Sequence, residues 1–274
     1  MIQLALSTLL SLASCSGGSV KIATLRGPSA LQMVQLIDSL SRCSDARISV
    51  TIYDEPMQLL EEMSSGDVDF ATLPVSMEEM LHGKGYGLSA VTIWGGMYLC
   101  GSASQAAGIG SLRGQTVHTL ARGMAPDILL RQILEKNGLA PDKDVIFDYS
   151  YPTHSELLKA AMAGRTSLCL LPEPLLSQAL NARPDLHIVA DLAEEWMKVE
   201  QTPLPVTALF CKEALAGKDE EAAVIEAIRQ SSLWVDSHPD AAADLAVRYG
   251  ISSDREAVKS SIPRSAFKVV AKKI

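Results

Sequence analysis

The sequence predicts an α/β protein built as two lobes, with mostly parallel sheets and helices on both faces of each sheet. Three observations support this prediction. The chain has 274 residues, of which 47% are hydrophobic and 20% charged, enough to bury the cores of two ordinary domains. Strand-like and helix-like apolar patterns alternate through the first hundred residues. The same alternation begins again near residue 116.

The first hundred residues contain three consecutive strand–helix units. Strands are expected at 20–25, 48–53 and 68–73. Helices are expected after residue 29, over 57–63, and over 76–81, where Ser76 is placed as the cap. Short strands at 88–93 and 97–100 then flank two glycines. They lead into a Gly-, Ala- and Ser-rich stretch at 101–110, where we place the crossover to the second lobe.

The second lobe repeats this order before the chain returns to the first. Its strands are expected at 116–120, 145–149, 167–171 and 187–191. Its helices are expected at 126–136, 155–163 and 175–180. A strand at 206–211 and helices at 220–238, 241–249 and 253–259 complete the first lobe. The predicted lobes are therefore 20–101 with 203–274, and an inserted 102–202.

An apolar leader ends at a cysteine. Residues 1–13 have no charged side chain and match the apolar core of a signal peptide. The segment Leu12-Ala13-Ser14-Cys15 resembles the bacterial lipobox, which implies that Cys15 becomes lipidated. Several acyl chains, at about 0.8 kcal/mol per buried methylene, would anchor the protein firmly. Residues 1–19 are therefore predicted to be signal peptide, lipobox and tether; the alternative is a hydrophobic first helix with an ordinary buried cysteine.

The other cysteines are Cys43, Cys100, Cys169 and Cys211, and none has the CxxC or Cys/His spacing of a metal site. No metal is expected. Small buried hydrophobic roles are the default interpretation, although an exported protein would be able to oxidise a close pair. One disulfide hypothesis pairs Cys100 with Cys211, since both fall on strands placed between the lobes.

Charge and motifs favour binding over catalysis. The net charge of −8 argues against nucleic acid as a partner. The sequence contains no GxSxG, no phosphate-binding GxxxxGK[ST], no GxGxxG after a strand, and no histidines spaced as metal ligands on a helix. We therefore expect a protein that is not an enzyme and that carries no cofactor.

Polar residues at the ends of four predicted strands form the candidate site. In open α/β sheets, ligands bind beyond the carboxyl ends of the strands, so a cleft between the lobes is expected. Arginine side chains and glycine-turn N–H groups there would hold an anion, a glutamate would accept from an amine, and an indole would stack on a flat ligand. The alternatives are helix caps with solvated arginines, surface turns, a structural glutamate and a core tryptophan. The candidate residues are Arg26, Gly27, Ser29, Pro74, Ser76, Trp94, Arg122, Gly123, Met124 and Glu173.

Four segments carry a family resemblance: GDVDFATLP at 66–74, LRGQTV at 112–117, NGLAPDKDV at 137–145, and AGRTS at 163–167 leading to LPEP at 171–174. They resemble the substrate-binding lipoproteins of ABC transporters in the nitrate/sulfonate/taurine and thiamine-precursor group, which have the type II periplasmic binding protein fold. The resemblance covers nearly everything from residue 20 to about residue 267. These motifs specify the scaffold more closely than the ligand.

The resemblance implies a solute-binding component of an ABC importer. Such a protein captures a small molecule, here expected to be anionic or heterocyclic, by lobe closure, and delivers it to a permease driven by a separate ATPase subunit. A lipid-anchored monomer in the cell envelope, outside the cytoplasm, is expected. Two alternatives remain: an enzyme on the same fold, such as the menaquinone-pathway dehydratase or the pyrimidine synthase of thiamine biosynthesis, and a surface ligand sensor. Those enzymes are cytoplasmic, so the lipobox distinguishes them.

Overall fold

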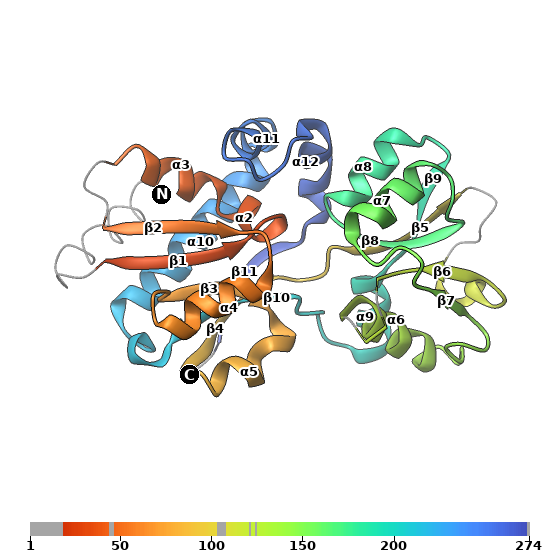
Figure 1. The fold of residues 1–274 in the computed structure, drawn as a ribbon, viewed down its shortest axis with the longest axis horizontal. Helices are drawn as coiled ribbons and strands as arrows, with labels where there is room; N and C mark the ends of the chain where they lie inside the picture. Colours follow the sequence, from red (N-terminus) through yellow and green to blue (C-terminus); the bar gives the residue numbers. More distant parts are fainter. Residues whose placement is uncertain (1–18, 44–46, 103–107, 121, 124, 273–274) are drawn as a thin grey trace. The chain divides into compact units, whose positions relative to one another are not determined.

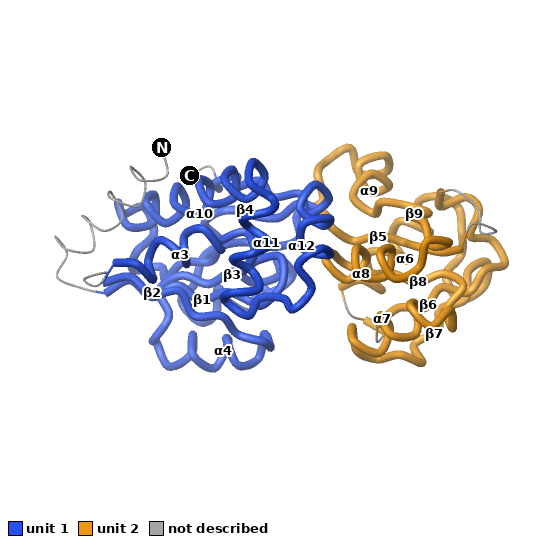
Figure 2. Tube along the Cα trace, turned by 90° about the horizontal axis from the view of Figure 1, so that it is seen from above, with its two compact units in different colours: residues 1–94, 205–274 blue, residues 95–204 orange. Residues whose placement is uncertain are grey.

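The computed structural model describes residues 19–43, 47–102, 108–120, 122–123 and 125–272. The chain divides into two compact units, residues 1–94 with 205–274 and residues 95–204 (Figure 2). The predicted boundaries, after residues 101 and 202, differ from these. Strand β5 (Met97–Ser102) pairs with strands of the second sheet, so the first boundary falls before it rather than after it.

The first unit contains a six-stranded sheet in the order β11-β4-β10-β3-β1-β2 (Figure 1). Its strands are β1 (Val20–Leu25), β2 (Ile48–Tyr53), β3 (Phe70–Pro74), β4 (Tyr86–Ile93), β10 (Thr207–Lys212) and β11 (Phe267–Ala271). Strands β2, β1 and β3 are parallel, as helical crossovers require. The pairs β3–β10, β10–β4 and β4–β11 are antiparallel, so the sheet is mixed and the expectation of mostly parallel pairing is wrong for this half of it.

Helices cover both faces of the first sheet. They are α2 (Pro28–Gln32), α3 (Val34–Ser41), α4 (Pro56–Ser65), α5 (Glu78–His82), α10 (Asp219–Ser237), α11 (Pro239–Arg248) and α12 (Arg255–Ser261). Successive side chains of β10 point to opposite faces of the sheet. Leu209 and Cys211 pack with the core under α3 and α10, whereas Ala208 and Phe210 pack with the core under α4. The three C-terminal helices thus complete the unit, as the sequence predicts.

The second unit contains a five-stranded sheet in the order β7-β6-β8-β5-β9. Besides β5, its strands are β6 (Thr116–His118), β7 (Ile146–Asp148), β8 (Leu168–Pro172) and β9 (Leu186–Asp191). Its helices are α6 (Ala125–Lys136), α7 (His154–Met162), α8 (Leu175–Ala182) and α9 (Leu192–Glu200). Leu99 packs in the core shared with α6, whereas its neighbour Cys100 packs in the core shared with α7 and α8. Pairing is parallel for β7, β6 and β8, and antiparallel for β8–β5 and β5–β9.

Several local predictions need correction. Ser76 does not cap a helix: it lies exposed in a 3₁₀ turn over Val75–Met77, and α5 begins after that turn with no side-chain cap. Side-chain caps occur instead at Thr153, which forms a capping box with Glu156, and at Asp191 and Asp254. Among helices in the described ranges, none has both the length and the apolar character needed to cross a bilayer.

Candidate functional site

At the carboxyl end of the parallel strands of the first unit, Arg26 forms an internal ion pair. It follows β1, and its guanidinium pairs with the carboxylate of Asp54, which follows β2, and also donates to the carbonyl of Gly250. About 38% of the Arg26 side chain and 66% of the Asp54 side chain are exposed. The charge predicted to capture an anion therefore already has a carboxylate partner.

The turn after Arg26 starts helix α2 at Pro28, two residues earlier than predicted. Gly27 is the N-cap, with a φ of 104°, a conformation that side-chain-bearing residues rarely adopt. Pro28 takes the first helical position, which its fixed φ and missing N–H suit. Ser29 consequently lies inside the helix, is buried, and does not cap it.

Three other candidates lie elsewhere in the first unit. Pro74 ends β3 opposite Thr207, and Ser76 is exposed in the following turn. Trp94 is half-buried directly after β4 and donates hydrogen bonds to β11 and to the residue before it. Its indole Nε1 donates to the carbonyl of Lys268 (2.7 Å), and its backbone N–H donates to the carbonyl of Ala266 (3.2 Å). The indole N–H is thus already used within the unit.

Buried polar side chains on β1, β3 and α2 were not among the candidates that the sequence indicated. Thr24 of β1 and Thr72 of β3 share a hydrogen bond of 2.7 Å between their hydroxyls. Gln32 is fully buried; its Nε2 donates to the carbonyl of Thr92 (2.9 Å), while its Oε1 has no hydrogen-bond partner in the structure. An unsatisfied buried acceptor is costly, so Gln32 is a candidate for contact with a ligand or water.

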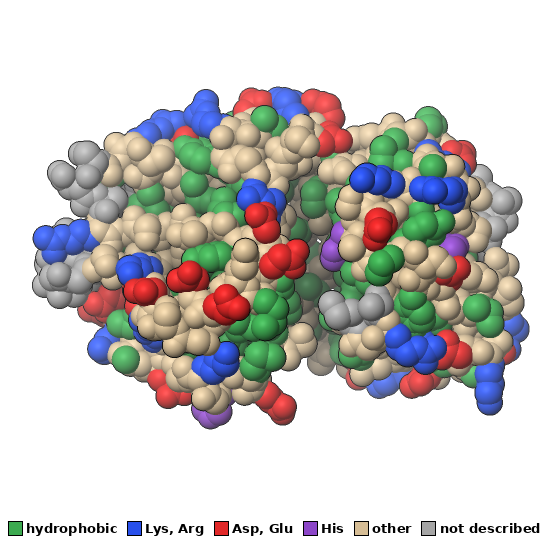
Figure 3. Space-filling view, viewed as in Figure 1, with side chains coloured by type: hydrophobic (Ala, Val, Ile, Leu, Met, Phe, Trp, Pro, Cys, Tyr) green, Lys and Arg blue, Asp and Glu red, His purple; other side chains and the backbone are tan. Residues whose placement is uncertain are grey.

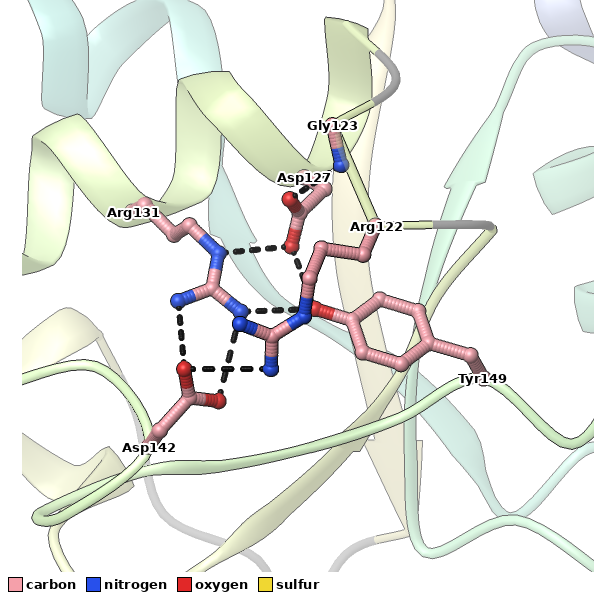
Figure 4. Close-up of polar contacts among 6 residues, drawn as sticks. All are labelled: Arg122, Gly123, Asp127, Arg131, Asp142 and Tyr149. Carbon is pink, nitrogen blue, oxygen red and sulfur yellow. Dashed lines mark hydrogen bonds and ion pairs between the residues drawn. The ribbon is translucent and has the colours of Figure 1, made fainter.

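At the same end of the second sheet, Asp127 organises a polar network (Figure 4). It lies in the first turn of α6 and is 1% exposed. Its carboxylate accepts from the backbone N–H of Gly123 (2.8 Å), from Arg131 Nε (2.8 Å) and from the Tyr149 hydroxyl (2.7 Å). The N–H of Gly123, predicted to approach a ligand, is therefore occupied by an internal carboxylate.

Two arginines extend this network toward Asp142. Arg131 forms a two-point contact with the Asp142 carboxylate (2.8 and 3.2 Å), and its guanidinium lies 4.2 Å from the ring centroid of Phe147. Arg122 donates to the same carboxylate at 3.2 Å and lies 5.6 Å from the ring centroid of Tyr149 (Figure 4). Arg131 is mostly buried, whereas the Arg122 side chain is 63% exposed. Arg122 is thus the network member best placed to exchange partners.

The network keeps its carboxylates ionised at neutral pH. Burial alone raises the pKa of Asp127, but hydrogen bonds from Gly123, Tyr149 and Arg131 lower it further than burial raises it, so the pKa lies below its usual value. The hydrogen bond from Arg131 lowers the pKa of Asp142 as well. Because Asp127 lies in the first turn of α6, its negative charge also offsets the positive end of that helix.

Glu173 accepts hydrogen bonds at the start of helix α8 in the second unit. It is 1% exposed; its Oε2 accepts from the backbone N–H of Ser177 (3.0 Å) and its Oε1 from the Ser177 hydroxyl (3.1 Å). Its own N–H donates to the carbonyl of Gly96 (3.0 Å). The carboxylate therefore serves the first turn of α8, in line with the structural alternative for this residue.

We expect Glu173→Ala to lower the free energy of unfolding by about 2 kcal/mol, because it removes the buried carboxylate that accepts from the N–H and the hydroxyl of Ser177. Glu173→Gln retains one carbonyl acceptor for the Ser177 N–H and is expected to cost less than half as much. Urea denaturation of the two variants beside the unaltered chain measures the difference. Equal losses in both would contradict the capping role.

His118 and Thr119, at the end of β6, are candidate site residues that the sequence did not indicate. Thr119 is buried and His118 is partly buried in the second unit, and neither His118 Nδ1 nor Thr119 Oγ1 has a hydrogen-bond partner in the structure. His118 Nδ1 lies 3.5 Å from the carboxylate of Asp148, and its ring centroid lies 5.7 Å from that of Tyr151. This end of the second sheet thus places the unpartnered hydroxyl of Thr119 next to a histidine that lies beside an aromatic ring.

Two predicted residues cannot be placed. Met124 and Cys15 lie outside the residues that the structure describes. Within the described ranges, no three His, Cys, Asp or Glu side chains gather as a metal site would require. A cavity of about 280 Å³ in the first unit is lined by none of the predicted residues; its lining is Asp236, Pro239, Ile262, Pro263, Ala266 and Phe267.

Comparison with known proteins gives structural matches. No protein-family model and no curated protein sequence matches the chain. A solved ABC transporter structure from Parabacteroides distasonis matches with a TM-score of 0.77 and 23% identity, over 92% of this chain and 86% of the other. The chain has the fold of ABC-transporter solute-binding proteins. The periplasmic aliphatic sulphonate binding protein SsuA from Escherichia coli matches with a TM-score of 0.72 and 16% identity, over 93% of this chain and 81% of that protein.

The nitrate-binding protein NrtA from Synechocystis PCC 6803 has the same solute-binding fold. It matches with a TM-score of 0.62 and 12% identity, over 93% of this chain and 74% of that protein. Coverage of both chains is high in all three comparisons, so the likeness extends over both units. At these identities the likeness establishes the fold, and the ligand has to be argued from this chain's own residues.

Proposed function

We propose that this chain is the solute-binding component of an ABC importer and acts outside the cytoplasm. The single observation that carries the proposal is the solute-binding fold, matched over nine-tenths of the chain. The sequence motifs at 66–74 and 112–117 support it independently of the fold comparison. The partners in this proposal are a small-molecule solute, a permease and an ATPase subunit, and the protein itself is not an enzyme.

The proposal includes a membrane anchor. Cys15, in the lipobox-like segment, would carry the lipid, and residues 16–19 would tether a monomeric binding protein to the cell envelope. Lipidation is tested by incorporation of labelled palmitate, which should be lost in Cys15→Ser. Incorporation that persists in this variant would contradict the anchor.

The proposed solute is uncharged and heterocyclic rather than a free oxyanion. Both arginines expected to hold an anion are paired with carboxylates, Arg26 with Asp54 and Arg122 with Asp142. The N–H of Gly123 is occupied by Asp127. An oxyanion at these positions would have to displace a carboxylate of the protein, and each such exchange gains little. Acidic and basic side chains also lie interspersed over each unit on the face shown in Figure 3.

A buried hydroxyl close to an aromatic ring supports a heterocycle. Thr119 Oγ1 has no hydrogen-bond partner in the structure. Tyr151 lies next to the neighbouring residue His118, whose Nδ1 faces the carboxylate of Asp148. A ring bearing nitrogen or oxygen atoms would satisfy the Thr119 hydroxyl and gain stacking area. This arrangement favours recognition by a few neutral hydrogen bonds, which discriminate strongly against analogues lacking them.

Thermal-shift measurements on the purified chain test both statements. Sulfate, nitrate, taurine, uncharged pyrimidines and purines, amino acids and polyamines are compared at equal ionic strength. A solute at about 100 times its Kd should stabilise the chain by roughly 2.7 kcal/mol. We expect an uncharged heterocycle to do so and the oxyanions not to. Saturable stabilisation by an oxyanion would refute the ligand class, whereas turnover of a substrate without stabilisation by any class would refute the binding function.

A matched pair of variants localises the solute. Thr119→Val removes a buried hydroxyl after the carboxyl end of β6, and Thr166→Val removes a buried hydroxyl before the amino end of β8. Both changes keep the side-chain shape. Titration of the stabilising heterocycle should show at least a fivefold loss of affinity for Thr119→Val and unchanged affinity for Thr166→Val, since one buried hydrogen bond contributes on the order of 1 kcal/mol. Equal affinities would remove Thr119 from the site.

A further inference from the structure

Two buried cysteines of the second unit lie directly opposite each other. Cys100 on β5 is the register partner of Cys169 on the antiparallel strand β8. Their Sγ atoms are 3.3 Å apart, and both residues are 0% exposed. The hypothesis of a Cys100–Cys211 disulfide is wrong, because Cys211 is buried in the core of the first unit on β10, whereas Cys100 is buried in the core of the second unit.

The strand geometry suits a covalent bond between these sulfurs. Opposed residues of an antiparallel pair have Cα atoms about 4.5–5.5 Å apart, which lies within the range that disulfides span. The strands also approach closely beside the pair. A Cβ on Gly101 would lie 2.7 Å from Leu168 Cδ2 and 2.9 Å from the carbonyl oxygen of Ser167. Glycine at this position therefore lets β5 and β8 approach closely next to the cysteines.

We propose that Cys100 and Cys169 form a disulfide while the chain folds, with a small-molecule or protein disulfide as the oxidant. The thiolate of one cysteine attacks the oxidant and releases one thiol, giving a mixed disulfide. The other cysteine then attacks the protein sulfur of that mixed disulfide and releases the second thiol. Two electrons and two protons pass to the oxidant, so two thiols become one disulfide.

Burial of the two sulfurs determines when these steps take place. Because both sulfurs are buried in the folded unit, the oxidant reaches them only before β5 and β8 pack against α7 and α8.

In the cell this disulfide rests on the proposed location outside the cytoplasm, where oxidants persist. The refolding test needs neither that location nor a solute, so its failure is distinct from failure of the binding function. The full chain is unfolded with reductant, refolded in a glutathione redox buffer or in reductant alone, and alkylated in denaturant. Digestion and mass spectrometry should then find the Cys100 peptide joined to the Cys169 peptide only after oxidative refolding.

Stability and matched variants complete the test. Oxidative refolding should raise the Tm by about 5 °C or more relative to the reduced chain. This rise and the joined peptides should disappear in Cys169→Ala and persist in Cys211→Ala, which removes a buried cysteine of the other unit. Alkylation of both Cys100 and Cys169 after oxidative refolding, or a bond from either one to a different cysteine, would overturn the proposal.

Discussion

Replacing Arg131 with methionine is expected to lower the free energy of unfolding of the second unit by about 3–5 kcal/mol. Asp127 is almost fully buried, and Arg131 is its cationic partner at 2.8 Å. Methionine preserves much of the side-chain volume but leaves a buried carboxylate with only the Gly123 N–H and the Tyr149 hydroxyl. It also removes the two-point contact with Asp142. The loss therefore comes mainly from an uncompensated charge.

Arg122→Met is the matched control. Arg122 contacts the same Asp142 carboxylate, but its side chain is 63% exposed, so we expect a loss below about 1 kcal/mol. Arg131→Lys keeps the charge without the planar fork and should fall between the two methionine variants. Hydrogen exchange of α6 and β7 during urea titration reports the stability of this unit. Similar losses for Arg131→Met and Arg122→Met would show that the buried network contributes no more than a surface pair.

The strands are largely predictable because apolar periodicity determines which residues can be buried. The bounds of β1 and β2 match the sequence prediction, since both are short apolar runs that lie between turn residues. Strand β11 is missed because it is a short edge strand with mostly exposed residues. Its pairing with β4 joins residues far apart in the sequence, such as Phe267 with Ile93, which local patterns do not report.

The candidate site is predictable only in part, because its partners come from distant segments. Arg122 and Gly123 are found by the rule that ligands bind beyond strand ends. Asp127 and Arg131 stand four residues apart on a helix, and this spacing was the available signal for their pairing. Tyr149 and Asp142 join them only once the sheet has formed. Thr119 can be recognised as a candidate only once the structure shows that its hydroxyl is buried and has no hydrogen-bond partner.

Acid is expected to destabilise the second unit below about pH 4, the ordinary range of an aspartate pKa. Folding lowers the pKa values of Asp127 and Asp142, so the folded unit binds fewer protons than the unfolded chain in this range. Their stabilising contribution is complete above the unfolded pKa and is lost as the pH falls through the folded pKa. Burial raises the pKa of Asp191 instead, so its contribution has the opposite sign and partly offsets the loss.

Asp127→Asn isolates the contribution of the buried carboxylate to this acid limb. Each unit by which folding lowers a pKa is worth about 1.4 kcal/mol, so removing the titrating group should visibly flatten the fall in stability between pH 5 and roughly pH 2. Asp240→Asn is the control, because Asp240 also has a lowered pKa but lies exposed among Lys259 and Arg255 in the first unit. Urea denaturation across the pH series, followed by hydrogen exchange in α6, measures both profiles. If the free energy of unfolding of Asp127→Asn falls with acid as steeply as that of the unaltered chain, acid acts on this unit through other groups, because asparagine does not titrate in this range.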